Sequence, residues 1–139
     1  MIYPPPNASQ GQKCFLLGWD ASLSEHIILN ELQSTVKRVK RKDYLQGLGT
    51  MIGEMKDILN KIDHTGPECF FEEDADVIRD IAKTFIKDGE ILEQKENAYF
   101  REHKYYPQKL DDEDIQILRK MWENASRIVD VLWNKYNIV

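Results

Sequence analysis

Acidic side chains at helical spacing are the residues of this chain that could most readily do chemistry. Glu54 and Asp57 are three residues apart, and Glu90, Glu93 and Glu96 repeat at the same interval. Residues at i and i+3 are neighbours on a helix surface, so carboxylates at this spacing could share a hard cation such as Mg²⁺. The same spacing is typical of acids that only cover a solvated helix face, and this is the interpretation that we favour.

The carboxylate pattern resembles in part that of the all-α nucleotide pyrophosphohydrolases, which hold Mg²⁺ with paired ExxE and ExxD helices. The ExxD form in this chain is Glu54-Met-Lys-Asp57, and it precedes the glutamates at 90–96. The order is therefore inverted relative to that family. The resemblance implies magnesium-dependent hydrolysis of nucleoside triphosphates, which we keep as an alternative function.

Other residues with catalytic potential are scattered. His26, His64 and His103 fall on three different segments, and the chain has no HExxH, GxSxG or P-loop pattern. Cys14 and Cys69 belong to no CxxC pair, so we expect two free thiols, with a single disulfide as the alternative. The sequence predicts no catalytic residue, no metal site and no cofactor.

Basic residues are concentrated in one short run. Five of the six residues at 37–42 are Lys or Arg, although the formal net charge of the chain is −5. At a helix C-terminus such cations face the negative end of the helix dipole, which gives the run a structural interpretation. A functional interpretation joins this run to the aromatic-rich segment near 99–106. On that interpretation the partner-binding residues are Lys37, Arg38, Lys40, Arg41, Arg101, Lys104, Tyr105 and Tyr106.

A surface of aromatic rings beside cations suits two kinds of partner. It fits an acidic segment of another protein, or single-stranded nucleic acid on which the rings could stack. The net negative charge argues against nonspecific nucleic-acid binding, so we expect a protein partner first. The alternative is that the tyrosines, including Tyr44 and Tyr99, complete the core and leave only their hydroxyls in water.

The elements that position these residues are predicted to be helices. Ser22 and Glu25 form a capping box that begins the first helix. The second helix covers about 45–62 and ends at the HTGP of 64–67, with Asp43 as its cap or a break at Gly47 and Gly49 as the alternative. The third runs from about Glu73 to Tyr105. The fourth begins after an N-cap at Asp111.

Apolar residues at helical intervals predict which faces are buried. Val77, Ile78, Ile81, Phe85, Leu92 and Tyr99 are expected to face inward on the third helix, and Ile115, Leu118, Trp122, Ala125, Val129, Leu132 and Tyr136 on the fourth. Ile117, Met121, Val131 and Trp133 are expected to be exposed, which predicts a possible homodimer through the fourth helix.

The predicted fold is all-α, an antiparallel four-helix bundle over 21–139 that follows an extended N-terminal arm over 1–20. A break near Asp88-Gly89 would give five helices instead, because Gly weakens a helix interior by about 1 kcal/mol. No apolar run approaches the roughly 20 residues that span a bilayer, and no signal peptide is evident. We therefore predict a cytoplasmic, non-catalytic interaction protein: a subunit, adaptor, immunity protein or inhibitor.

Overall fold

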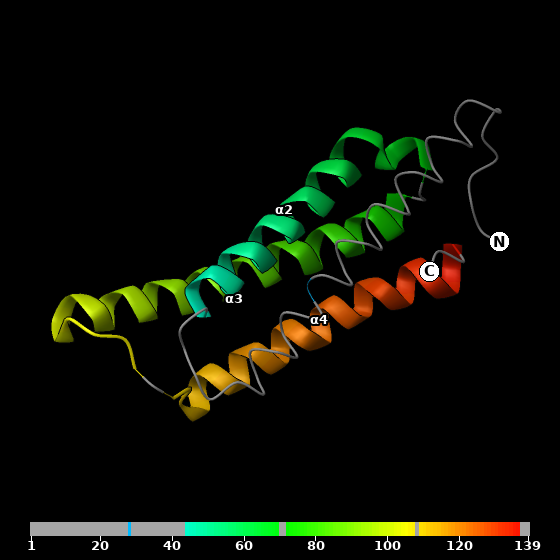
Figure 1. Cartoon of the computed structure of the whole chain (residues 1–139). Coiled ribbons are helices and arrows are strands. Elements are labelled where there is room, and N and C mark those ends of the chain that lie inside the picture. Colours follow the sequence, from blue (N-terminus) through cyan, green and yellow to red (C-terminus); the bar gives the residue numbers. More distant parts are fainter. Residues whose placement is uncertain (1–27, 29–43, 70–71, 108, 137–139) are drawn as a thin grey trace.

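The computed structural model describes residues 28, 44–69, 72–107 and 109–136. Within these residues the chain forms three helices and no strand, so the predicted all-α class is confirmed there (Figure 1). The helices are α2 (Tyr44–Cys69), α3 (Glu72–His103) and α4 (Asp112–Tyr136). The predicted arm and first helix, with the caps Ser22 and Asp43, lie outside the described residues apart from Ile28, which is helical and buried.

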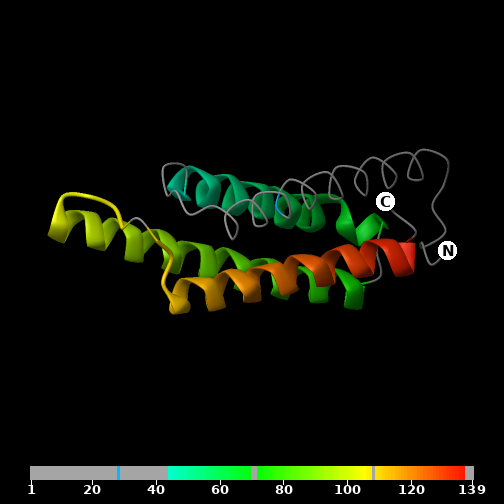
Figure 2. The same cartoon turned by 60° about the horizontal axis from the view of Figure 1, so that its bottom comes forward.

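Helix α3 is the central element of the described fold, and α2 and α4 both run antiparallel to it (Figure 2). Arg79 of α3 reaches Asp63 of α2 at 2.7 Å, and Lys95 of α3 reaches Asp111, just before α4, also at 2.7 Å. Sixteen residues of helix separate the two cations, which places them roughly 160° apart around the α3 axis. The two neighbours therefore flank α3 on different sides.

The core follows the helical period of three and four residues along each element. Phe85 of α3, Leu48 of α2 and Leu118 of α4 have no measurable exposure. The side chains that join them in one buried cluster include Met51, Ile52, Met55, Ile58, Ile62, Ile78, Ile81, Leu92, Met121 and Ile128.

Helix α3 passes through Asp88 and Gly89 without a break, so the alternative of five helices through a break there is wrong. Gly89 is buried, and a Cβ placed on it would lie 2.8 Å from Ile52 Cγ1 and 3.4 Å from Met121 Cε. Glycine is present because α2 and α4 approach α3 closely at this point, and the packing offsets its poor helix propensity.

At its beginning, α2 excludes one of the two predicted alternatives, and at its end it extends further than predicted. The helix begins at Tyr44 and contains Gly47 and Gly49, so these glycines do not form a break. It also continues through Gly66 and Pro67 to Cys69, and the predicted end at 64–67 is wrong. Proline removes one backbone donor and can bend a helix without ending it. Figure 1 shows α2 changing direction in its last turns.

The beginning of α4 confirms the predicted N-cap. The Asp114 backbone N–H donates to Asp111 Oδ1 at 2.8 Å, which satisfies a donor that the first turn would otherwise leave free. Acids occupy the first turns of both α3 and α4, at the end where the helix dipole favours negative charge.

Five side chains lie differently from the prediction. Tyr99 and Ile115 were expected inside, but both are half-buried and neither belongs to the core cluster. Val77 and Trp122 were expected inside, but they are 42% and 40% exposed. Each is displaced by about 100° around its helix from a buried neighbour, Ile78 or Met121. Met121 was expected outside and is fully buried against α3. Ile117 and Val131 pack partly against the core, so the exposed apolar face of α4 is smaller than expected. Homodimerisation through α4 stays a prediction.

An ion-pair cluster around Lys95 joins α3 to the start of α4. Lys95 Nζ lies 2.7 Å from Asp111 Oδ2, 2.9 Å from Asp114 Oδ1 and 3.7 Å from Glu113 Oε2. Partial burial alone would lower the pKa of Lys95, but hydrogen bonds to Asp111 and Asp114 outweigh it and raise this pKa above its ordinary value. The Asp114 side chain is only 6% exposed, so its ion pair with Lys95 helps to compensate a buried charge.

Among the described helices, none combines the length and the apolar content that crossing a bilayer requires.

The close contact at Gly89 predicts opposite effects for two glycine-to-alanine changes. Gly89→Ala should lower the free energy of unfolding by about 1 kcal/mol, because overpacking costs about 1–3 kcal/mol and better helix propensity returns about 1. Gly53→Ala is the matched control, since nothing lies within 4 Å of a Cβ there, and it should gain about 0.5–1 kcal/mol. Urea denaturation measures both. Ile52→Ala should reduce the cost of Gly89→Ala, and equal costs in both backgrounds would contradict the contact.

The Lys95 cluster predicts that Lys95→Gln lowers the free energy of unfolding by about 1–2 kcal/mol, because it removes the ion pair that Lys95 makes with the buried Asp114 carboxylate. The raised pKa means that this contribution is fully present below about pH 10 and is lost only as the pH rises through the higher folded value. Lys83→Gln on the exposed side of α3 is the control and should change little. Equal effects of the two changes in urea denaturation at pH 7 would show that the cluster adds no stability.

Candidate functional site

The C-terminal end of α3 projects past both of its neighbours. Figures 1 and 2 both show this end extending beyond the start of α2 and of α4. Lys95 contacts the first turn of α4, so residues 96–103 continue for about 12 Å beyond that contact. We define the α3 tip as residues 99–107, the end of the helix together with the turn that leaves it.

Two aromatic pairs organise the α3 tip. Phe100 and Tyr106 stack with ring centroids 4.6 Å apart and an interplanar angle of 24°. Tyr99 and Tyr105 meet edge to face at 5.8 Å, and a hydrogen bond with Tyr105 is the main reason that the pKa of Tyr99 is raised. His103 lies 4.1 Å from the Tyr99 ring and 5.8 Å from the Tyr105 ring. The rings on the turn therefore pack back onto the helix end.

Lys104 ends the helix in a conformation that is unusual for a side chain. Its φ is 64°, in the left-handed region that glycine normally occupies after a helix. The Lys104 N–H donates to the Phe100 carbonyl at 2.7 Å, which is the hydrogen bond of the αL helix cap. A residue with a Cβ costs about 1–2 kcal/mol there. Strained backbone of this kind concentrates at functional sites, which makes this turn a candidate for one.

The α3 tip presents both apolar rings and positive charge to solvent. Phe100, Tyr106 and Tyr105 are 38%, 40% and 58% exposed, and Arg101 and Lys104 are exposed beside them. With His103 neutral, two cations and one carboxylate give the tip a net charge of about +1. Large exposed aromatics that are grouped together are typical of contact surfaces in other proteins.

The structure brings together half of the predicted partner-binding residues. Arg101, Lys104, Tyr105 and Tyr106 all lie in the α3 tip. The other four, Lys37, Arg38, Lys40 and Arg41, lie outside the described residues. The alternative that the tyrosines complete the core and leave only their hydroxyls in water holds in part for Tyr44, whose ring is buried but whose hydroxyl is buried as well. It is wrong for Tyr105 and Tyr106, which are exposed.

Sequence reasoning missed three features that shape this end of the molecule. Phe100 was not counted among the binding residues, although its stacking with Tyr106 is the centre of the tip. Lys95 was not recognised as a partner of the acids at 111–114. Nothing in the residue type of Lys104 indicated a left-handed conformation, since glycine or asparagine is the usual signal.

The carboxylates that could share a cation do not converge. Glu90 is exposed, Glu93 is half-buried and Glu96 is buried, because three-residue steps drift by about 60° each around a helix. Among the described residues, no group of three His, Cys, Asp or Glu side chains is placed to hold a metal ion. The geometry therefore offers the magnesium-dependent alternative no support in this part of the chain.

Comparison with protein-family models, with curated proteins and with solved structures gives no match to this chain.

The left-handed turn predicts that Lys104→Gly raises the free energy of unfolding by about 0.5–1 kcal/mol, because glycine removes the Cβ penalty at φ 64°. Lys104→Ala is the control: it removes the same charge and keeps the Cβ, so it should bring no gain. Urea denaturation of the wild type, Lys104→Gly and Lys104→Ala measures the free energy of unfolding of each protein. A gain from alanine as large as that from glycine would contradict the strained conformation.

Proposed function

We propose that this chain is a non-catalytic helical interaction protein that binds an acidic segment of another protein through the α3 tip. One observation carries the proposal: a helix end projects beyond its neighbours and exposes Phe100, Tyr105 and Tyr106 beside two cations. A projecting end can enter a concavity on a partner, and aromatic and Arg side chains are the residues that most often dominate binding energy at such contacts.

The order of the tip also supports binding. The two ring pairs and the αL cap hold the turn against the helix. The conformational entropy of the tip has therefore largely been lost during folding. Binding a partner does not incur this cost again, which favours affinity.

An acidic protein segment suits the tip better than a nucleic-acid strand does. The formal net charge of the whole chain is −5, which disfavours nonspecific binding to the phosphates of a nucleic acid. Phe100 and Tyr106 already stack on one another, so this contact takes up one face of each ring that a base could otherwise stack on.

The wider architecture in this proposal is an antiparallel four-helix bundle over 21–139 in a cytoplasmic protein, with an arm over 1–20. Burial of Ile28 in the same core as α2, α3 and α4 supports a further helix in the bundle. The proposed surface includes Lys37, Arg38, Lys40 and Arg41 as predicted from the sequence.

The test is affinity capture from native lysate with three matched baits. The tip bait carries Arg101→Glu, Lys104→Glu and Tyr105→Ser. The control bait carries Arg119→Glu, Lys83→Glu and Trp122→Ser, which make the same kinds of change at exposed positions elsewhere. A partner retained by the wild type and the control, but reduced at least tenfold by the tip bait, is the expected result, because truncating a central aromatic costs more than about 1 kcal/mol.

Two further outcomes would overturn the proposal. Equal retention by the tip and control baits would remove the tip from the interaction. Loss of the partner after nuclease treatment would favour the single-stranded nucleic-acid alternative, which predicts oligonucleotide binding at 50 mM salt that weakens steeply as salt increases.

A further inference from the structure

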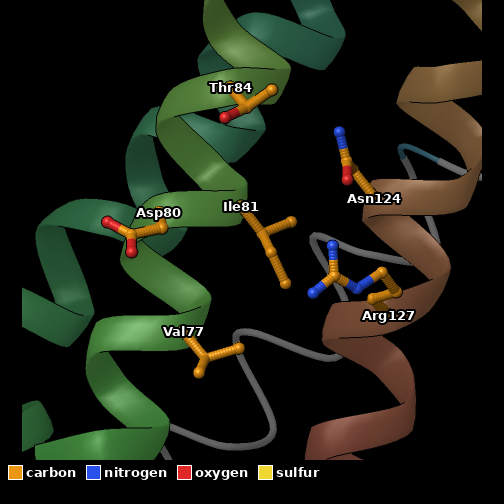
Figure 3. Close-up of a pocket in the computed structure, with 6 residues that line it drawn as sticks. All are labelled: Val77, Asp80, Ile81, Thr84, Asn124 and Arg127. Carbon is orange, nitrogen blue, oxygen red and sulfur yellow. The ribbon is translucent and has the colours of Figure 1, made fainter.

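A second feature, away from the tip, is an open groove between α3 and α4 with a volume of about 280 Å³. Its lining consists of Val77, Asp80, Ile81, Thr84, Asn124 and Arg127 (Figure 3). This volume is at the lower limit of the roughly 300–1,000 Å³ that is usual for small-molecule sites. Any occupant must therefore be small.

The two walls of the groove have different chemistry. In Figure 3 the α3 wall presents the aliphatic side chains of Val77 and Ile81, whereas the α4 wall presents the Asn124 amide and the Arg127 guanidinium. Asn124 and Arg127 are three residues apart on one helix, so both groups face the groove from the same side. Such a site has an apolar surface for the body of a ligand and hydrogen-bond donors for one polar end.

The polar groups of the α4 wall are not engaged elsewhere. Neither Arg127 nor Asn124 makes a side-chain hydrogen bond or ion pair within the described structure. Asn124 is half-buried, so its amide is partly withdrawn from water. A guanidinium beside an amide is well suited to a carboxylate, because its planar N–H groups match the two oxygens.

The charge of the groove limits the ligand further. Arg127 is the one cation in the lining, and Asp80 is the one acid. Figure 3 shows the Asp80 carboxylate turned away from α4, on the far edge of α3. From there it does not compete for Arg127, but its field disfavours a second negative charge on a ligand. A singly charged carboxylate is favoured over a phosphate.

We propose that this groove binds a small organic monocarboxylate, with its carboxylate on Arg127 and Asn124 and its apolar body against Val77 and Ile81. The site is separate from the α3 tip and from the function proposed for the tip. It would allow a small acid to bind at the α3–α4 interface.

Titration of the full-length ¹⁵N-labelled protein with phenylacetate, followed by amide chemical shifts, tests the site. We expect shifts concentrated around Val77–Thr84 and Asn124–Arg127, with weaker binding of the neutral phenylacetamide and of the dianionic phenyl phosphate. Arg127→Gln should weaken phenylacetate binding by about fivefold, the size typical of an exposed charged contact. Arg119→Gln, the same charge change about two helical turns earlier on α4 and outside the groove lining, should leave binding unchanged.

Three results would each overturn this site: no saturable shift with phenylacetate, equal binding of phenylacetamide, or equal effects of Arg127→Gln and Arg119→Gln. Asn124→Ala removes the amide donor and keeps the charge of Arg127, so it measures the contribution of the amide by itself. It should also weaken phenylacetate binding. Thermal unfolding of each variant confirms that it is folded before the comparison is made.

Discussion

The close approach of α2 and α4 to Gly89 is the constraint on which the rest of the described structure depends. It fixes how far the antiparallel helices overlap. Residues 90–103 of α3 follow Gly89, whereas only 112–120 of α4 precede Met121, which faces it. With a rise of about 1.5 Å per residue, the end of α3 must extend beyond its neighbour. The projecting tip is thus a consequence of where the glycine stands, and a bulkier residue there would disturb the contact that sets the overlap.

A helix end that extends beyond the described helices α2 and α4 gains little from the core that they form with it, so local interactions contribute more to its order. The α3 tip has three such interactions: the αL cap at Lys104, the stack of Phe100 on Tyr106, and the edge contact of Tyr99 with Tyr105. Each is made between residues within six positions of one another, so the tip can hold its shape independently of the bundle. Its apolar rings are exposed despite their cost in water, which is easier to understand for a surface that a partner covers.

The sequence predicted helix existence well and helix contacts poorly. The N-cap at Asp111 was recognised because its signal is local, in an aspartate followed by acids at the first turn. Gly89 was predicted to be a possible break in the helix, because helix propensity measures only the cost of glycine within its own helix. The contacts that offset this cost come from Ile52 and Met121, which are far away along the chain. Lys95 was missed for the same reason: its partners follow a reversal whose geometry no local pattern encodes. Arg101, Lys104, Tyr105 and Tyr106, which are half of the predicted binding residues, lie together because all four belong to the end of α3 and the turn that follows it.

Charge pairing along the α3–α4 interface explains why its two ends differ in character. Near the tip, Lys95 of α3 is hydrogen-bonded to Asp111 and Asp114 at the start of α4. The negative charge of these two acids is therefore partly neutralised within the interface. Further along, Asp88 lies close enough to Lys120 for that charge to oppose the burial that raises the pKa of Asp88. Beyond this point no opposing pair follows among the described residues, and the groove beside Arg127 opens where the next pair would stand. The α3–α4 interface therefore has paired charges near the tip, and further along it has the groove with Arg127, where we propose that a carboxylate binds.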